Sequence, residues 1–220
     1  MPSNTPRRRP RARQGEGEHL RTELIDAART ILTETGRADA VTLRGVARAV
    51  GVSAPSIYLH FEDRDALLRA VLIDSFEKFG RALAEAPGTG DPARDLRSGC
   101  LAYLDFTRRS DGAYAVLFSG IVDVESLLPG GRRPGVEEPC EAEDPGMEAF
   151  EALVATVQAA IDRGQVPDRR ARPTAVAIWT HLHGAAGLRR AMPRFGWPSD
   201  EELVDGLLAD LAGISPPDAG

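Results

Sequence analysis

The chain has 220 residues, 42% of them hydrophobic, and a net charge of −6. A chain of this size can bury an ordinary core, which argues against wholesale disorder. No stretch approaches the roughly 18 apolar residues of a membrane span, and the N-terminus lacks a signal-peptide core, so we expect a cytoplasmic protein. The two cysteines, Cys100 and Cys140, fit no zinc-binding or redox spacing and predict free thiols.

Charge is unevenly distributed along the sequence. Residues 1–66 hold eleven Arg and nine Asp or Glu, a balance of +2, whereas the remainder holds sixteen basic and twenty-four acidic residues, a balance of −8. This asymmetry would direct the N-terminal end of the molecule toward a polyanion. Residues 1–18 lack apolar periodicity and predict a disordered tail, whose arginines lie either along DNA or, as is commoner for such tails, in solvent.

Three helices are predicted after this tail. Apolar residues recur with helical spacing over residues 20–36. Thr42 can cap a second, short helix that ends at Gly51. Ser53 can cap a third helix with Pro55 in its first turn, where the missing N–H has no consequence. Two short helices separated by Gly-Val-Ser indicate a helix-turn-helix, a DNA-binding motif.

The rest of the chain predicts further helices separated by one long loop. The loop covers residues 123–143, which are rich in Pro, Gly and acidic residues. The helices are expected over about residues 63–85, 91–109, 111–120, 144–164, 172–192 and 199–213. Because no strand-like alternation extends beyond a few residues, the sequence predicts an all-α fold.

The third helix begins with small side chains and ends with aromatic ones. Ala54, Pro55 and Ser56 would let its backbone approach base edges in a major groove. Tyr58 and His60 are long enough to reach phosphate oxygens, while their neighbours, Ile57 and Phe61, are expected to turn toward the core. Arg44 and Arg48, four residues apart, lie on one face of the second helix beside a DNA backbone. In the alternative interpretation, the helix pair is only a structural corner and the aromatic rings only fill the core.

The segment over residues 41–71, VTLRGVARAVGVSAPSIYLHFEDRDALLRAV, resembles the DNA-binding segment of the TetR family of repressors. The family pattern is matched by Thr42, Gly51, Val52, Ser53, Tyr58, His60, Phe61, Arg64, Leu67 and Leu68. Further along, WTHLHGAAGL resembles the Trp-His-Gly signature of one branch of that family.

The resemblance implies a domain order and a set of DNA contacts. It implies a disordered tail (1–18), a three-helix helix-turn-helix domain (19–66), a helical ligand-binding and dimerisation domain (67–214) and a flexible C-terminus (215–220). Positions that contact phosphate in the family are occupied here by Thr42, Tyr58, His60 and Arg64, the last where the family usually has Lys. Positions that approach bases are occupied by Arg44, Ala54, Pro55 and Ser56.

The recognition helix departs from stronger base readers. Residues 54–59 contain no Arg, Lys, Asn or Gln, so they cannot make bidentate base contacts. We expect specificity to rest on Arg44, on Ser56, on apolar contacts of Ala54 and Pro55 with thymine methyl groups, and on DNA shape. Each such contact should discriminate by about 1 kcal/mol.

The C-terminal half offers candidates for a ligand site. Trp179 and His183 share one face of a helix and form either a pocket wall or a core with a satisfied histidine. His181 and His183 point about 200° apart, so they cannot share a metal ion. The aromatic residues of the middle helices either line a cavity or fill the core: Tyr103, Phe106, Tyr114 and Phe118.

The last two predicted helices carry a candidate dimer interface. Small residues and a leucine stripe suit close helix packing, either between two chains or within one: Ala177, Gly184, Gly187, Leu203, Leu207 and Leu211. A two-fold dimer is favoured because paired half-sites about 34 Å apart require a symmetric partner. Members of the TetR family dimerise through their last two helices, so the resemblance implies the same surface.

These patterns predict a dimeric transcriptional repressor that a small apolar ligand releases from a palindromic double-stranded operator. In the alternative, the C-terminal domain only dimerises or binds a protein partner. The sequence shows no nucleophile elbow, phosphate-binding glycine loop, paired metal ligands or HExxH spacing, so we expect neither an enzyme nor a bound metal or cofactor.

Overall fold

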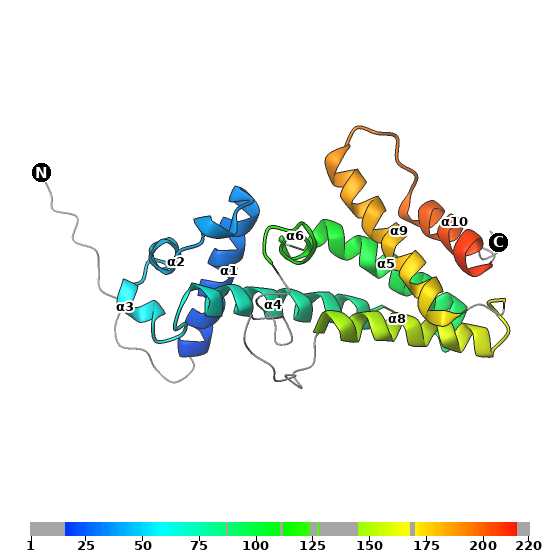
Figure 1. Ribbon diagram of the computed structural model, residues 1–220, viewed down its shortest axis with the longest axis horizontal. Coiled ribbons are helices and arrows are strands. Elements are labelled where there is room, and N and C mark those ends of the chain that lie inside the picture. Colours follow the sequence, from blue (N-terminus) through cyan, green and yellow to red (C-terminus); the bar gives the residue numbers. More distant parts are fainter. Residues whose placement is uncertain are drawn as a thin grey trace, which may run out of the picture. The chain divides into compact units, whose positions relative to one another are not determined.

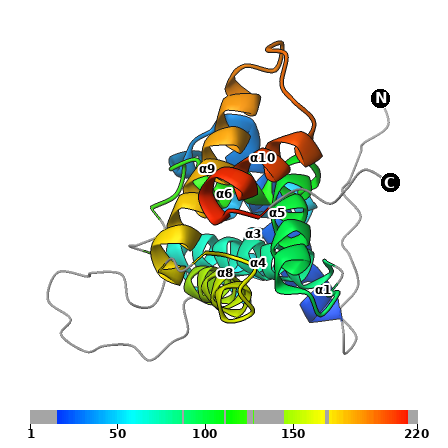
Figure 2. The ribbon, with the colours of Figure 1, turned by 90° about the vertical axis from the view of Figure 1, so that its right-hand side faces the viewer.

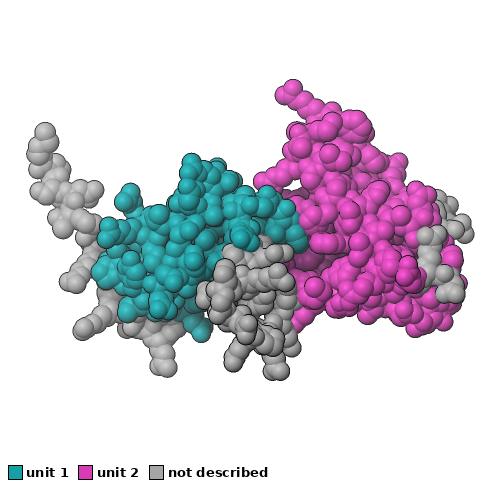
Figure 3. Space-filling model, in the orientation of Figure 1, with its two compact units in different colours: residues 1–75, 115–138 teal, residues 76–114, 139–220 magenta. Residues whose placement is uncertain are grey.

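The computed structural model describes residues 16–86, 88–110, 112–123, 127, 145–167 and 170–214. Within these ranges the regular elements are helices and no strand is present, which confirms the predicted all-α fold (Figure 1). The chain forms two compact units (Figure 3): unit 1 comprises residues 1–75 and 115–138, and unit 2 comprises residues 76–114 and 139–220. No helix in the described ranges is long and apolar enough to cross a membrane.

Unit 1 is built from helices of the N-terminal part of the chain. Its elements are α1 (Glu16–Thr35), the 3₁₀ turn η1 (Ala38–Ala40), α2 (Leu43–Val50), α3 (Ala54–Ile57) and the first part of α4 (Arg64–Ala84). α1 begins within the predicted tail 1–18, whose first fifteen residues lie outside the described ranges. The core takes apolar side chains from α1, α2, α3 and α4 and from the turn after α3: Leu24, Leu32, Val46, Ile57, Phe61, Leu67 and Val71.

The ends of α2 follow the predicted capping pattern. The Thr42 side chain accepts a hydrogen bond from the Gly45 N–H at 3.1 Å. A Cβ at Gly45 would lie 2.8 Å from Thr42 Oγ1, so a glycine here leaves room for the cap. Gly51 ends the helix with φ 77°, a left-handed conformation that favours glycine, and its N–H donates to the carbonyls of Ala47 and Arg48.

The predicted Ser53 cap is wrong in its partner. Ser53 occupies the N-cap position of α3, but its hydroxyl forms no hydrogen bond to a backbone N–H of the helix. Instead, Ser53 Oγ and Ser56 Oγ are hydrogen-bonded to each other at 2.6 Å. The hydroxyl of Ser56 therefore takes the place of the backbone N–H that an ordinary cap would bind.

Unit 2 is a bundle of longer helices. It contains the end of α4, α5 (Pro92–Arg109), α8 (Pro145–Asp162), α9 (Ala171–Ala191) and α10 (Asp200–Ala212); α6 (Ala113–Phe118) starts in unit 2 and continues into unit 1. α5 packs against α8, α9 and α10, and α9 packs against α8 and α10 (Figure 2). The predicted loop 123–143 lies outside the described ranges except for Asp123 and Leu127.

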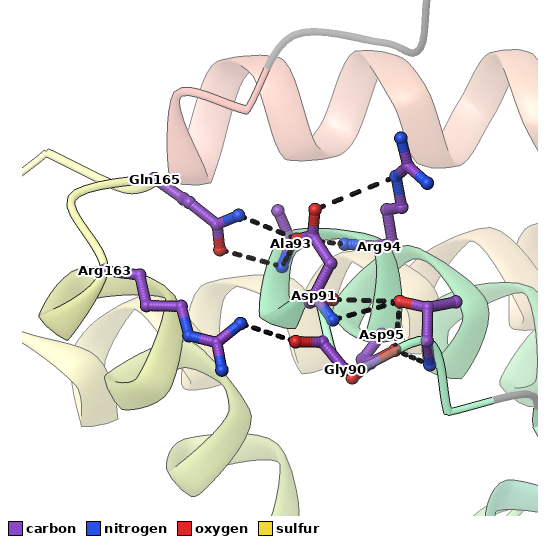
Figure 4. A network of polar contacts seen from close by, with 8 residues as sticks. Gly90, Asp91, Ala93, Arg94, Asp95, Arg163 and Gln165 are labelled. Carbon is purple, nitrogen blue, oxygen red and sulfur yellow. Dashed lines mark hydrogen bonds and ion pairs between the residues drawn. The ribbon is translucent and has the colours of Figure 1, made fainter.

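A polar network fixes the start of α5 to the segment after α8 (Figure 4). Asp91 caps α5 by accepting from the Ala93 N–H at 3.0 Å, and it also accepts from Gln165 Nε2 at 2.7 Å. The Gln165 hydrogen bond holds the pKa of Asp91 below its usual value despite partial desolvation. Arg163 donates to the Gly90 carbonyl in the same network.

α10 starts at a capping box between Ser199 and Glu202.

Candidate DNA-binding and effector sites

The end of α3 exposes a tyrosine and a leucine. Tyr58 is 54% exposed and Leu59 is 84% exposed, whereas Ile57 and Phe61 are buried, as predicted. The chain continues past α3 in a tight turn, in which the N–H groups of His60 and Phe61 both donate to the Ile57 carbonyl at 3.0 Å. This turn leaves Tyr58 exposed while Ile57 and Phe61 are buried, which suits a phosphate contact. No sequence pattern indicated a role for Leu59.

The predicted base-approaching residues differ in exposure. Arg44 and Pro55 are exposed, while Ala54 and Ser56 are half-buried. Because the Ser56 hydroxyl is paired with that of Ser53, the two serines offer one shared donor rather than two independent ones. The guanidinium of Arg44 is therefore the strongest hydrogen-bond donor among the predicted base-reading residues.

Two predicted phosphate-binding side chains also hold the local backbone. Thr42 Oγ1 accepts from Gly45, which leaves its O–H to donate outward. Arg64 Nε donates to the Val41 carbonyl at 3.1 Å, and its Nη2 donates to the Ala38 carbonyl at 2.6 Å. Arg64 thus ties α4 to the segment preceding α2, a positioning role that sequence reasoning missed.

A buried ion pair joins α1 to α4 within unit 1. Arg29 is 4% exposed and donates to Asp74 Oδ2 at 2.8 Å, and it also pairs with Asp26 on its own helix. Arg29 Nε is buried without a hydrogen-bond partner. The only signal in the sequence is a charged residue directly after the buried Ala28 of the apolar stripe, a pattern too weak to predict a pair 45 residues apart.

Nearly all of the predicted ligand-site residues come together in unit 2. The Tyr103 hydroxyl is hydrogen-bonded to His183 Nδ1. The ring of His183 lies 5.7 Å from that of Tyr114 and 5.3 Å from that of Trp179, measured between ring centroids. Tyr103 and Tyr114 are buried, His183 is half-buried, and Trp179 is 39% exposed. We call Tyr103, Tyr114, Trp179 and His183 the aromatic cluster.

Two phenylalanines that sequence reasoning missed extend the aromatic cluster. The Phe79 ring lies 5.6 Å from Tyr103 and 5.2 Å from Phe106, which connects Phe106 to the cluster. The Phe150 ring lies 5.8 Å from Trp179 at the other end. Phe118, also predicted for the ligand site, is half-buried and belongs to unit 1.

Burial keeps the polar groups of the aromatic cluster uncharged. Desolvation raises the pKa of Tyr103 well above its usual value, and it also raises the pKa of Tyr114. The same desolvation lowers the pKa of His183. If Tyr103 donates to Nδ1, the neutral imidazole carries its proton on Nε2. The cluster therefore presents hydrogen-bonding groups in an apolar setting without a formal charge.

The predicted dimer residues fall into two groups. Gly184 and Gly187 are exposed on α9, and Ala177, Leu203 and Leu211 are half-buried. Leu207, which we expected in the interface, is instead 3% exposed and buried in the core of unit 2. α10 buries one face within its own unit: Val204, Leu207, Leu208 and Ala212. Part of the leucine stripe therefore packs within the chain.

The sequence and the fold match known families over most of the chain. Residues 24–71 match the family described as bacterial regulatory proteins, tetR family. Residues 96–211 match the tetracyclin repressor-like C-terminal domain. The chain belongs to the TetR family. Its members are DNA-binding transcriptional regulators and not enzymes, in agreement with the expectation from the sequence.

Two curated relatives match part of the chain. The HTH-type transcriptional repressor KstR2 of Rhodococcus jostii is 40% identical over 68 residues, which cover 29% of this chain and 33% of the relative. An HTH-type transcriptional repressor of Mycobacterium tuberculosis is 34% identical over 82 residues, covering 36% of this chain and 43% of the relative. The chain thus spans less than half the length of the curated relatives it matches.

Solved structures share the fold over most of the chain. A putative TetR-family transcriptional regulator from Rhodococcus sp. has a TM-score of 0.63 at 24% identity, over 88% of this chain and 97% of that one. AibR in complex with isovaleryl coenzyme A and operator DNA has a TM-score of 0.66 at 15% identity, over 90% and 98% of the two chains. At these identities the likeness establishes the fold.

Within this TetR-family chain, the described residues contain no group of three or more His, Cys, Asp or Glu side chains that could hold a metal ion. His181 is exposed and His183 bonds Tyr103.

Proposed function

We propose that this TetR-family regulator is a homodimeric repressor that binds a palindromic operator in the bacterial cytoplasm and releases it when a small ligand occupies unit 2. The observation that carries the ligand-dependent part is the uncharged Tyr103–His183 hydrogen bond within a cluster of aromatic rings. A few polar groups set in an apolar, aromatic environment are typical of small-molecule sites.

Operator binding would use the exposed surface of α2 and α3. Tyr58, His60 and the Thr42 hydroxyl would bind phosphates, while Arg44 would provide the main base contact. Ala54, Pro55 and the shared serine hydroxyl would contribute weak discrimination. Arg64 would support this surface by holding the segment before α2.

Dimerisation would use the outward face of α9. Gly184 and Gly187 permit close approach of a second helix, and the large apolar side chains nearby are exposed in the single chain: Val176 is 43% exposed and Leu188 is 51% exposed. A second copy would cover these side chains and set the spacing of two DNA-binding units. Leu203 and Leu211 would lie at the edge of this interface.

The ligand would act by shifting a conformational equilibrium. It lowers operator affinity only to the extent that it binds the DNA-incompetent arrangement more tightly than the competent one. Because AibR has been solved with isovaleryl coenzyme A and operator DNA, acyl thioesters are candidate ligands for this chain. In the second candidate function, unit 2 only dimerises or binds a protein, and the rings of the aromatic cluster serve as its core.

The experiment measures operator binding by fluorescence anisotropy, with a DNA site selected from random sequences and over a salt series. Arg44→Ala should reduce the preference for the selected site by about 1 kcal/mol. Tyr58→Phe should weaken selected and random DNA equally, since a phosphate contact carries no sequence information. Equal binding of selected and random DNA by the wild type would contradict operator recognition.

The ligand-dependent part is tested with the same complex. Acyl thioesters, carboxylates and neutral apolar compounds are added to the operator complex, and a ligand should release wild-type protein but not Tyr103→Phe/His183→Phe, which lacks the polar pair. Release that is unchanged in this variant would contradict a site at the aromatic cluster. Failure of every compound class would favour the protein-binding or dimerisation role.

A further inference from the structure

Arg190 is a cation without an ion-pair partner in the described part of the chain. The preceding residue, Arg189, pairs with Asp200 and donates to the Pro198 carbonyl at 2.7 Å. Arg190 forms no such bond with any described residue, and its side chain is exposed. A guanidinium group that lies on a folded helix without a counter-charge can bind an anion bidentately.

Arg190 lies in line with the aromatic cluster. Successive residues of an α-helix are about 100° apart, so Trp179, His183 and Arg190 fall within about 40° of one another on α9. They form a stripe about 16 Å long, since each residue rises about 1.5 Å along the axis. Ala186 and Gly187 flank this stripe between His183 and Arg190 and carry at most a methyl group, so no large side chain at either position separates the rings from the guanidinium.

Tyr114 provides a second link between Arg190 and the rings. The Tyr114 ring lies 5.7 Å from that of His183. Burial raises the pKa of Tyr114, and the positive charge of Arg190 acts against that rise. The charge is thus close enough to act on a member of the aromatic cluster, although the guanidinium itself remains in solvent.

We propose that this stripe is a binding site for an amphipathic anion, whose apolar body lies against Trp179 and whose carboxylate or phosphate group binds Arg190. The inference rests on the proposed ligand-dependent function and narrows the ligand class. The 39% exposure of the Trp179 indole leaves a large ring in contact with solvent, where an apolar body can cover it. The cluster is uncharged, so the negative group of the ligand has Arg190 as its counter-charge on this stripe.

A last-turn arginine can have a simpler role. Arg189 and Arg190 both lie in the last turn of α9, where positive charge complements the helix dipole. That role would contribute to stability and would leave ligand binding independent of the residue. The two roles therefore predict different effects of Arg190→Gln.

The experiment uses the fluorescence of Trp179 in the full chain. The sequence contains two tryptophans, so Trp197→Phe leaves Trp179 as the only one. Octanoate and 1-octanol serve as probes that share an apolar chain and differ in charge. Isovaleryl coenzyme A and coenzyme A alone serve as phosphate-bearing probes with and without an acyl group. Arg194→Gln, which removes an exposed arginine beyond α9, is the control for net charge.

We expect octanoate or isovaleryl coenzyme A to change the Trp179 emission, and Arg190→Gln to weaken that binding at least about tenfold, the effect of losing a charge-assisted hydrogen bond. Arg194→Gln should leave the binding of these anions unchanged. 1-Octanol should bind the Arg190→Gln and Arg194→Gln proteins equally well. Thermal unfolding of the Arg190→Gln protein confirms that it is folded.

Three outcomes would overturn the inference. In the first, octanoate and 1-octanol bind equally well and Arg190→Gln has no effect on either. In the second, coenzyme A binds as tightly as its isovaleryl thioester. In the third, neither octanoate nor isovaleryl coenzyme A changes the Trp179 emission at concentrations up to about 1 mM. Operator release by another ligand would survive each of these. Conversely, Arg190-dependent binding that leaves operator affinity unchanged would support the anion site and contradict the proposed repressor release.

Discussion

At the scale of single residues, Arg29 is the most deeply buried charged side chain in the described part of unit 1. Its guanidinium is almost fully buried and depends on Asp74 of α4 and Asp26 of α1. A buried charge that loses a partner keeps its desolvation penalty. Removing an acidic partner of Arg29 should therefore cost more stability than removing one partner of a surface ion pair. This pair also fixes how α1, a support of the DNA-binding helices, sits on α4.

Replacing Asp74 should therefore be more harmful than replacing Asp26. Asp74→Ala should lower the free energy of unfolding by about 2–3 kcal/mol, somewhat below the range for fully buried pairs because Asp26 remains as a partner. Asp26→Ala, at a side chain that is 52% exposed, should lower it by less than about 1 kcal/mol. Urea denaturation measures both values, and equal losses would contradict the assigned roles.

His183 should make the protein less stable in mild acid. Burial lowers its pKa in the folded chain, so below the usual value of 6.5 the unfolded chain binds a proton that the folded chain does not. Stability is therefore complete above that pH and decreases as the pH falls, by at most about 1.4 kcal/mol per pH unit for one histidine.

The measurement is thermal unfolding between pH 7.5 and 5.5. His183→Asn keeps an acceptor for Tyr103 but cannot titrate, so its melting temperature should decline less steeply than that of the wild type. The other histidines are common to both proteins. Parallel declines would show that His183 is not the responsible group.

At the scale of elements, the start of α2 depends on one coupled pair. Thr42 caps the helix because Gly45 has no Cβ in the way. An alanine at position 45 would improve helix propensity but displace the capping hydroxyl. The two effects are of similar size and opposite sign.

This coupling predicts a double-mutant cycle. Gly45→Ala should be nearly neutral in the wild type, because a propensity gain of up to about 1 kcal/mol offsets the loss of the cap. In a Thr42→Ala background, where no cap remains to lose, the same change should stabilise by up to about 1 kcal/mol. Equilibrium denaturation of the four proteins gives the coupling energy, and additive effects would refute the steric link.

The sequence predicted these elements well where the signal was local. Asp91 and Ser199 mark the starts of α5 and α10, and Gly51 marks the end of α2, because capping depends on residues a few positions apart. The Ser53 cap was wrong because a competing hydroxyl, Ser56, lies within the same turn. Long-range partners such as that of Arg29 leave no periodic signal and could not be predicted.

At the scale of the whole molecule, helix periodicity distinguished buried from exposed faces but not which neighbour covers them. The leucine stripe of α10 could pack within one chain or between two, and Leu207 proved to be internal. Trp179 and His183 were predicted as ligand-site candidates from their shared helix face, and the residues of the middle helices from their aromatic content. Their convergence on His183 depends on packing among α5, α6 and α9, which one-dimensional spacing does not contain.

The proposed dimer gives a prediction at this scale. Gly184→Arg places a long charged side chain on the exposed face of α9, so it should yield a monomer and lose most operator affinity, because a single unit reads only one half-site. Ala155→Arg, on an exposed position of α8, is the matched control and should remain dimeric. Sedimentation analysis measures the mass, and a dimeric Gly184→Arg protein would exclude this face as the interface.

The deep burial of Cys100 determines how fast its thiol can react with an alkylating reagent. Its side chain is 2% exposed, and burial raises the pKa of the thiol to about 12, so the reactive thiolate is scarce while α5 is packed. Alkylation of this residue must wait until unit 2 opens. In a Cys140→Ser variant, the rate at which Cys100 is labelled under native conditions therefore reports how often unit 2 opens. A ligand that stabilises the helical bundle of unit 2 will lower the labelling rate of Cys100, even where it causes no visible movement of a helix.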